Sequence, residues 1–194
     1  AIDTRVWLLE LTPATPVWKQ LVTTGAVPWR AYAASGWDPV GRKLYVFGGM
    51  NQNNQPQGDL WMLDVAKAHW TRLTDANPKA PPARLLAAGA YATDVKKLVV
   101  FGGMVGGVEL SDLWTIDLPE SPSATNSTWS EVTVSDAPTA RLGHRFFEGS
   151  QHQPLALFGG GADFSIMSPK MLSDVYLLTW KPAPSWTSPA PTVV

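Results

Sequence analysis

The sequence predicts an all-β protein built from a repeated unit of short strands, and three observations carry this prediction. The 194-residue chain contains 10 Trp, 16 Gly and 17 Pro but only 16% charged residues, and such a composition favours strands and tight turns. An apolar run ending in Phe-Gly-Gly occurs three times, at residues 43–49, 97–103 and 154–160. An arginine precedes each double glycine at a constant distance. Self-similarity of this kind indicates a repeat architecture.

The double-glycine segments are the first predicted element of the repeat. Their apolar runs are bounded by Gly, Pro, Asn and Asp, which is typical of short buried strands joined by turns. Glycine allows a positive φ where a chain must bend close to a neighbouring backbone. The repeat glycines are Gly48, Gly49, Gly102, Gly103, Gly159 and Gly160.

The other elements of the repeat lie at regular positions around the glycines. Arg30, Arg84 and Arg141, each in a proline-containing turn, precede the first glycine of their unit by 18 residues. A strand of the pattern Asp-apolar-aromatic follows at residues 59–64, 112–117 and 174–178. A tryptophan then closes each unit, at Trp70, Trp129 and Trp186, and its large side chain suits packing between neighbouring units.

This combination of an arginine turn, a strand into Gly-Gly, an Asp-apolar-aromatic strand and a closing tryptophan resembles the kelch-repeat family, which includes the galactose oxidase and kelch-type propellers. The resemblance covers nearly the whole chain and implies a β-propeller of four-stranded blades. It implies the following division: a half blade (its third and fourth strands) at 1–24, blades at 25–75, 76–134 and 135–188, and a tail at 189–194. Prolines make the last strand of the third full blade uncertain.

About three and a half blades do not close a ring, because closed propellers use about 4 to 8. Family members usually close with about six or seven blades. We therefore expect an arc of a larger six- or seven-bladed ring. The remaining blades would come from the same parent chain or from a second chain, because open blade edges are normally covered.

Charge and composition exclude several classes of function. The net charge is −1, with 15 basic and 16 acidic residues, so we expect no nucleic-acid partner. No apolar run reaches the length of a transmembrane helix, and no signal-peptide pattern is present, so no membrane insertion is expected. Without cysteine there is no disulfide and no cysteine-linked copper site of the galactose oxidase type. The compartment stays open, with the cytoplasm slightly favoured; the glycosylation pattern at Asn126 would matter only in an exported protein.

Catalytic and metal-binding motifs are also missing from the sequence. The three histidines, His69, His144 and His152, are too scattered for a set of metal ligands. No zinc-protease, phosphate-loop or nucleophile-elbow signature occurs. We expect no catalytic residue, no metal site and no cofactor, and the sequence favours a protein that is not an enzyme.

The connections between the second and third strands are the candidate binding elements, at residues 50–58, 104–111 and 161–173. They differ in length and content while the strands stay constant, as expected when loops carry specificity. The longest offers four apolar side chains to a protein partner or to the propeller body: Phe164, Ile166, Met167 and Met171. The loop around Asn51, Asn53 and Asn54 offers amide groups that suit carbohydrate, or it is an ordinary solvated turn.

The repeated charged residues admit two interpretations. The three arginines could form a basic ring for an acidic peptide, or each could fix its own turn through backbone carbonyls. Their identical repeat position favours the structural interpretation. The aspartates at the start of the third strands, Asp59, Asp112 and Asp174, are likewise expected to cap turns and not to bind metal.

We therefore predict a protein-interaction scaffold that binds a protein partner through the loop face of a kelch propeller. The first alternative is a sugar- or small-molecule-active propeller, similar to mutarotase-like or specifier-like members, with a site on the propeller axis. The second alternative is a structural subunit of a large assembly.

Overall fold

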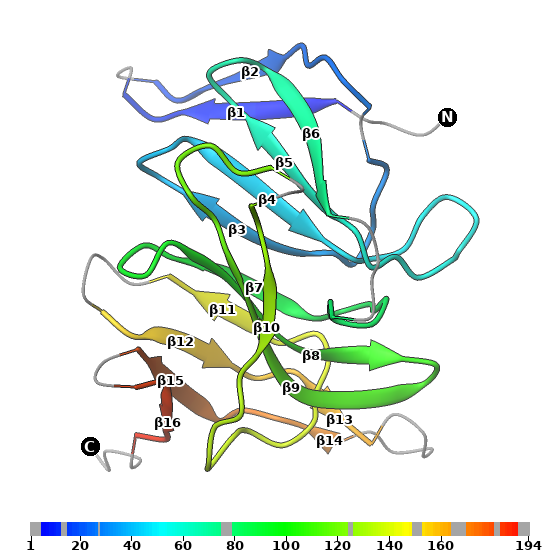
Figure 1. Cartoon of the computed structure of the whole chain (residues 1–194), viewed down its shortest axis with the longest axis vertical. Coiled ribbons are helices and arrows are strands. Elements are labelled where there is room, and N and C mark those ends of the chain that lie inside the picture. The colour runs from blue at the N-terminus through cyan, green and yellow to red at the C-terminus, as the bar shows by residue number, and fades with distance from the viewer. Residues whose placement is uncertain are drawn as a thin grey trace.

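The computed structural model describes residues 5–12, 15–26, 28–74, 79–123, 126–148, 153–163, 170–180 and 183–189. All regular elements in this part of the chain are strands, and every neighbouring pair is antiparallel. The sheets stack along the long axis of the molecule, with the N-terminal sheet at one end and the C-terminal sheet at the other (Figure 1).

The chain begins with a two-stranded half sheet, β1 (Val6–Glu10) and β2 (Val17–Leu21). Blade 1 follows, in the order β3 (Ala34–Asp38), β4 (Lys43–Phe47), β5 (Leu60–Asp64) and β6 (His69–Thr74). Blade 2 has the same order, with β7 (Ala88–Ala92), β8 (Lys97–Val105), β9 (Val108–Asp117) and β10 (Trp129–Glu131).

Blade 3 contains β11 (Arg145–Phe147), β12 (Leu155–Phe158), β15 (Val175–Thr179) and β16 (Ser185–Thr187). A separate hairpin, β13 (Gly161–Ala162) with β14 (Lys170–Met171), lies in the connection between β12 and β15. The last strand, uncertain from the sequence, is present as the three residues of β16. Trp186 lies in it, opposite Leu178 of β15.

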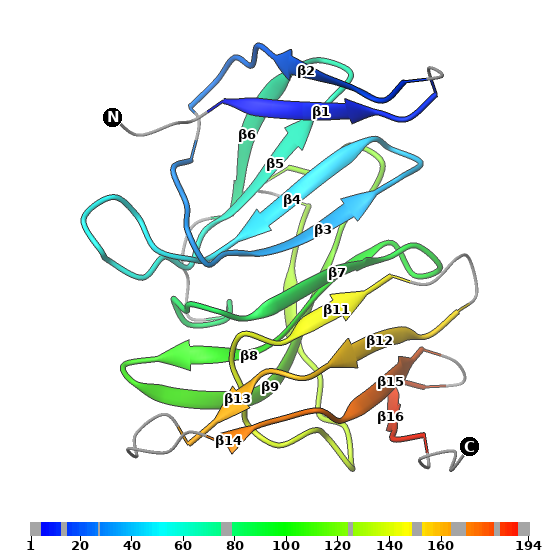
Figure 2. The same ribbon diagram turned by 180° about the vertical axis from the view of Figure 1, so that it is seen from behind.

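The first strands of the blades, β3, β7 and β11, are neighbours in space, so they form the inner edge of the arc (Figure 2). Two glycines allow the first two of them to approach closely. A Cβ on Gly36 would lie 2.7 Å from the backbone N of Tyr91, and one on Gly89 would lie 2.8 Å from the backbone O of Ser35. Any side chain at these positions would push the inner strands apart.

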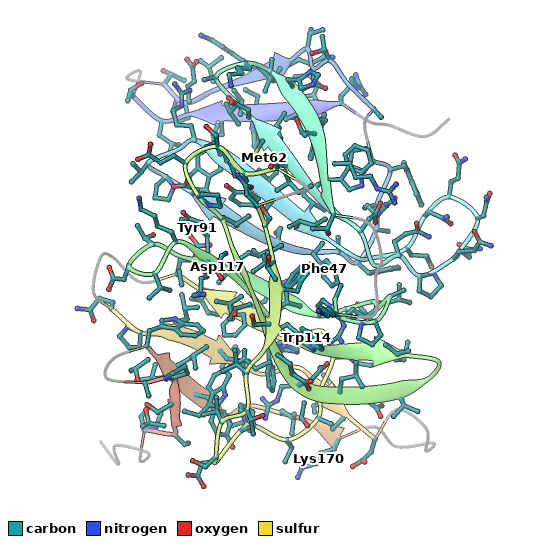
Figure 3. The ribbon with its side chains drawn as sticks, viewed as in Figure 1. Phe47, Met62, Tyr91, Trp114, Asp117 and Lys170 are labelled. Atoms are coloured by element: carbon teal, nitrogen blue, oxygen red, sulfur yellow. The ribbon has the colours of Figure 1, made fainter. Side chains whose placement is uncertain are left out.

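The hydrophobic core consists of layers between successive sheets. Leu63 and Trp70 of blade 1 pack against the half sheet. Phe47, Met62 and Tyr91 belong to the layer between blades 1 and 2 (Figure 3). A third layer joins blades 2 and 3 around Phe101, Leu157 and Trp186. Each blade therefore depends on its neighbours to bury its two faces.

These sheets form an open arc, and the predicted all-β architecture of four-stranded antiparallel blades is confirmed. One predicted connection has a different form. Residues 104–111 continue β8 and β9 as a regular hairpin, with Val105 opposite Val108. Gly106 and Gly107, at φ +58° and +87°, supply the two left-handed residues that a two-residue hairpin turn requires. No helix long and apolar enough to cross a membrane occurs among the described residues.

Candidate binding face and the frame that holds it

Each repeat arginine is the centre of a polar frame inside its own blade. Arg84 is 1% exposed, and its two Nη atoms each donate to a different oxygen of Asp112 at 2.7 Å. Arg84 also donates to the backbone O of Gly102 at 3.0 Å and of Pro82 at 3.2 Å. Trp114 Nε1 donates to Asp112 Oδ2 at 2.7 Å. One guanidinium thus ties the arginine turn to the double glycine and to the start of β9.

Blade 3 repeats this frame with a different aromatic residue. Arg141 is fully buried and donates to Asp174 at 2.6 and 2.9 Å and to the backbone O of Gly159 at 3.0 Å. Its guanidinium carbon lies 5.4 Å from the ring centroid of Tyr176, in cation–π geometry. The hydrogen bond from Arg141 holds the pKa of Asp174 below its usual value, and partial burial opposes this effect.

In blade 1 the arginine binds its aspartate through one of its two Nη atoms only. Arg30 Nη2 donates to both oxygens of Asp59 at 2.7 Å, and Arg72 approaches the same carboxylate at 3.3 Å. Burial alone would raise the pKa of Asp59, but the hydrogen bonds from Arg30 and Trp61 outweigh it, so this pKa is lowered. With Arg84 and Arg141 buried in the same kind of pair, these side chains present little charge to an acidic peptide.

Backbone hydrogen bonds connect the frames of successive blades. Gly49 N donates to the backbone O of Arg84 at 2.8 Å, and Gly103 N donates to that of Arg141 at 2.9 Å. Arg84 N in turn donates to the backbone O of Gln57 at 3.1 Å. The double glycine of one blade therefore lies against the arginine turn of the next. The connections between second and third strands emerge beside these turns, on one side of the arc (Figure 1).

We call this side the connection face; its described residues are 50–58, 104–111, 161–163 and 170–173. The first connection is a polar loop organised by Asn51. Asn51 Oδ1 accepts hydrogen bonds from Asn53 N at 2.9 Å and Gln55 N at 3.0 Å. Asn54 adopts φ +59°, and Asn53 and Asn54 are exposed. Asn51 thus shapes the loop, and its two neighbours offer their amides to the surroundings.

The other two connections present apolar side chains on the same face. Val108, beside the tip of the β8–β9 hairpin, is 62% exposed, and Met171 of β14 is 74% exposed. Three of the predicted contact residues, Phe164, Ile166 and Met167, lie outside the described residues. The sequence did not single out Val108, because the hairpin that displays it depends on how far β8 and β9 extend.

The inner edge of the arc carries a polar contact that sequence reasoning missed. Trp37, Tyr91 and Glu148 occupy the equivalent position on β3, β7 and just after β11, seven residues after their arginines. Glu148 Oε1 accepts hydrogen bonds from the backbone N of Tyr91 at 2.9 Å and of Trp37 at 3.3 Å. Aligning the units on their arginines places a carboxylate where the others have an aromatic residue, which is the signal that could have identified it.

A hollow of about 590 Å³ adjoins this contact on the inner side of the arc. Residues of all three blades line it, among them Ser35, Trp37, Gly89, Arg145 and Glu148. No cluster of three or more His, Asp or Glu with the geometry to hold a metal ion occurs in the described part of the chain.

His144 is buried beneath the frame of blade 3. It is 1% exposed, and its Nε2 lies 3.1 Å from the backbone O of Phe101, so Nε2 carries the proton. Its Nδ1 has no hydrogen-bond partner among the described residues. Burial, together with the charge of Arg141, lowers the pKa of His144 to about 4. The histidine is therefore neutral at physiological pH and packs as an uncharged ring.

Comparison with known proteins identifies the repeat. The family model described as the KLHDC2/KLHL20/DRC7 Kelch-repeats domain matches residues 2–192. The chain belongs to the kelch-repeat family. This kelch-repeat chain is 31% identical to Adagio-like protein 1 of Oryza sativa subsp. japonica and 32% identical to Adagio protein 3 of Arabidopsis thaliana. Both matches cover 89% of the chain and 29% of the relative.

A more distant kelch relative is Host cell factor 1 of Mus musculus, which is 27% identical over 92% of the chain and 9% of that protein. The kelch-repeat chain thus spans less than a third of the length of these curated relatives. The comparisons agree with the fold at the level of the repeat, and they leave the partner of this chain to be inferred from its surface.

Proposed function

We propose that this chain is a protein-interaction scaffold that binds a protein partner through its connection face. The observation that carries the proposal is that exposed apolar side chains and polar loop residues lie together on one side of the blades, beside the buried Arg–Asp pairs. Val108 and Met171 are the apolar anchors, and Asn53 and Asn54 belong to the polar rim. Protein interfaces typically combine a few apolar anchors with a polar rim.

The contrast between frame and connections supports this assignment. The repeat arginines of blades 2 and 3 have the same kinds of partner. Arg84 and Arg141 each donate hydrogen bonds to an aspartate and to a glycine carbonyl. The connections beside them are a polar loop, a long hairpin and a short hairpin. A constant scaffold with variable loops is the usual arrangement for specific recognition. We propose that the repeat arginines, aspartates, glycines and tryptophans have structural roles.

The family supports a binding role in general terms, because kelch domains generally mediate protein interactions. In our proposal the open arc is part of a larger ring of six or seven blades. Phe164, Ile166 and Met167 belong to the proposed binding connection because they are the apolar residues of its central part.

Site-specific photo-crosslinking tests the proposed face. A crosslinker at residue 53, on the same face, is expected to capture a defined protein from the source lysate, and adding Val108→Ser and Met171→Ser to that crosslinker-bearing chain is expected to abolish the capture. Val40, 75% exposed in the turn between β3 and β4 at the other end of the strands, provides the matched control. Val40→Ser should retain the partner. Replacing residues 161–173 by a Gly-Ser linker should weaken capture by the crosslinker at position 53; unchanged capture of the same partner after both changes would overturn the proposal.

The axial hollow favours one second candidate, a site for a small polar ligand such as a sugar. Trp37 offers an aromatic surface, and Arg145 and Glu148 offer charged hydrogen-bonding groups from a different blade. Such convergence of an aromatic and polar side chains is typical of ligand sites. A thermal-shift screen of sugars tests this candidate. Stabilisation that Trp37→Ala and Arg145→Ala both remove would support it, and no stabilisation by any sugar would exclude it.

A further inference from the structure

A pocket of about 310 Å³ lies between blades 1 and 2. Three segments form it: the β3–β4 turn, the β7–β8 turn and the residues that follow β9. All three lie at the end of the strands opposite the connection face (Figure 1). Both blades have all four strands, and they pack against each other through a shared core layer. The volume is at the lower end of the range for small-molecule sites, about 300 to 1,000 Å³.

The two turns that border the pocket are held by hydrogen bonds. Asp38 Oδ1 accepts from the backbone N of Val40 and of Gly41, both at 3.0 Å, which closes the first turn. In the second turn Lys96 has φ +52°, and its backbone O accepts from Leu118 N at 3.1 Å. Leu118 is buried in the core layer between the blades. The pocket is therefore built into the fold, as small-molecule sites usually are.

Apolar groups form much of the pocket wall. Val40, Leu118 and Pro119 contribute their side chains, and Tyr91 contributes its ring. Tyr91 stacks on Tyr45, with ring centroids 5.7 Å apart. Burial, together with the charge of Asp38, raises the pKa of Tyr91 to about 12, so its hydroxyl is uncharged at neutral pH. These walls favour a ligand with an apolar body.

The charged groups at the pocket favour an acidic ligand over a basic one. Asp38 is buried, and its Oδ1 already accepts from two backbone amides. Lys43 donates to the backbone O of Glu120. Lys96 also lines the pocket, but its ammonium makes no hydrogen bond or ion pair with the described residues. An anionic group on a ligand would therefore meet a cation that has no protein partner in this part of the chain.

We propose that this pocket binds a small carboxylic acid with an apolar body, whose carboxylate pairs with Lys96. The single charge follows from the other lining residues, because Asp38 and Glu120 would repel a second negative charge. A phosphate monoester carries about −1.5 to −2 charges at pH 7 and is therefore disfavoured. The site is separate from the connection face, so this proposal and the proposed scaffold function fail or succeed independently.

Titration of the isotope-labelled whole chain with naphthoate, followed by NMR, tests the proposal. The backbone amides of Gly41 and Thr93 should shift, because both residues line the pocket. The amide of Gly106, on the connection face, should not. Naphthamide keeps the rings and lacks the charge, so it should bind about tenfold more weakly. Naphthyl phosphate should also bind more weakly than naphthoate, because of the two carboxylates at the pocket.

Lysine variants identify the cation. Lys96→Gln should lower the affinity for naphthoate by about tenfold and leave the affinity for naphthamide unchanged. Lys96→Arg keeps the charge and should retain most of the affinity for naphthoate. Lys67→Gln is the matched control, because it removes an equal charge from an exposed lysine that does not line the pocket.

Four results would each overturn the proposal. The first is the absence of shifts at the amides of Gly41 and Thr93 during titration with naphthoate. The second is equal affinity for naphthoate and naphthamide, which would show that the pocket does not recognise the charge. The third is tighter binding of naphthyl phosphate than of naphthoate. The fourth is an affinity for naphthoate that is the same in Lys96→Gln as in the wild type.

Discussion

Arg84 and Asp112 form a two-armed ion pair in which each Nη atom lies 2.7 Å from a different carboxylate oxygen. The pair joins residues 28 positions apart, and it holds the turn that enters blade 2 against the strand that leaves the connection face. Arg141 and Asp174 repeat it in blade 3. The position of the connection face therefore depends on buried charge inside each blade.

Removing one member of the pair should destabilise the protein strongly. In Arg84→Met the partly buried Asp112 loses its counter-ion and Gly102 O loses a donor. We expect the free energy of unfolding in urea to fall by about 3 kcal/mol. Lys97→Met provides the control, because Lys97 and Asp117 pair on the surface and such pairs contribute about 1 kcal/mol or less. Equal losses in the two variants would contradict the role assigned to Arg84.

The Arg–Asp pairs also mark the boundary of what the sequence could predict. The constant distance from arginine to glycine was visible in the sequence, and in blades 2 and 3 the structure joins these residues by a hydrogen bond from the arginine to the glycine carbonyl. The pairing of Arg84 with Asp112 was not predicted, because the spacing between the two charged residues varies among the units. It depends on the position of the third strand beside the arginine turn, which only the folded blade fixes.

Two glycines that both have a positive φ should differ in their tolerance of alanine. Gly103 (φ +91°) lies where a Cβ would be 2.6 Å from the backbone O of Leu85, whereas a Cβ on Gly106 (φ +58°) would meet nothing within 4 Å. Gly106→Ala should cost about 1–2 kcal/mol from the left-handed backbone alone. Gly103→Ala should cost at least twice as much, because the backbones of neighbouring segments must separate. Urea unfolding of both variants checks this order; similar losses would show that the close approach is unimportant.

His144 should make stability depend on pH. Its pKa of about 4 in the folded state lies below the ordinary value of 6.5, so the unfolded chain binds a proton first as pH falls. The stability is fully present above pH 6.5 and is lost progressively down to pH 4. Between pH 7 and pH 5 the wild type should lose about 2 kcal/mol more than His144→Gln.

Urea unfolding of both proteins at the two pH values measures this difference. The lowered pKa values of Asp59 and Asp174 also make stability fall as these carboxylates protonate, but in a more acidic range. They therefore affect both proteins equally in this comparison. The same pH dependence in His144→Gln and in the wild type would contradict the role of the buried imidazole.

Glu148 should hold the inner strands together through backbone amides. In Glu148→Ala the amides of Trp37 and Tyr91 lose their shared acceptor, and their hydrogen exchange should accelerate by about tenfold. Glu148→Gln keeps an acceptor oxygen and should lie between the alanine variant and the wild type. Exchange rates measured by NMR at these two amides, compared with Val100 in the core, test the contact; unchanged rates in Glu148→Ala would exclude it.

The candidate binding face was only partly predictable for a similar reason. Periodicity placed the connections at residues 50–58, 104–111 and 161–173, and composition suggested apolar contacts in the last one. Val108 was not predicted, because its exposure depends on two glycines that form a tight turn at the end of two long strands. Asn51 was predicted as a contact residue, and in the structure its side chain carbonyl binds the loop backbone.

The measurement that tests the central claim most directly is hydrogen exchange by mass spectrometry on the full chain, with and without the partner captured by crosslinking. The account predicts slower exchange in residues 51–57, 104–111 and 170–172. The turns at the other end of the strands, residues 38–43 and 92–97, should be unchanged. Protection confined to those turns or to the inner strands, with the connection face unaffected, would contradict the proposal that this face binds the partner.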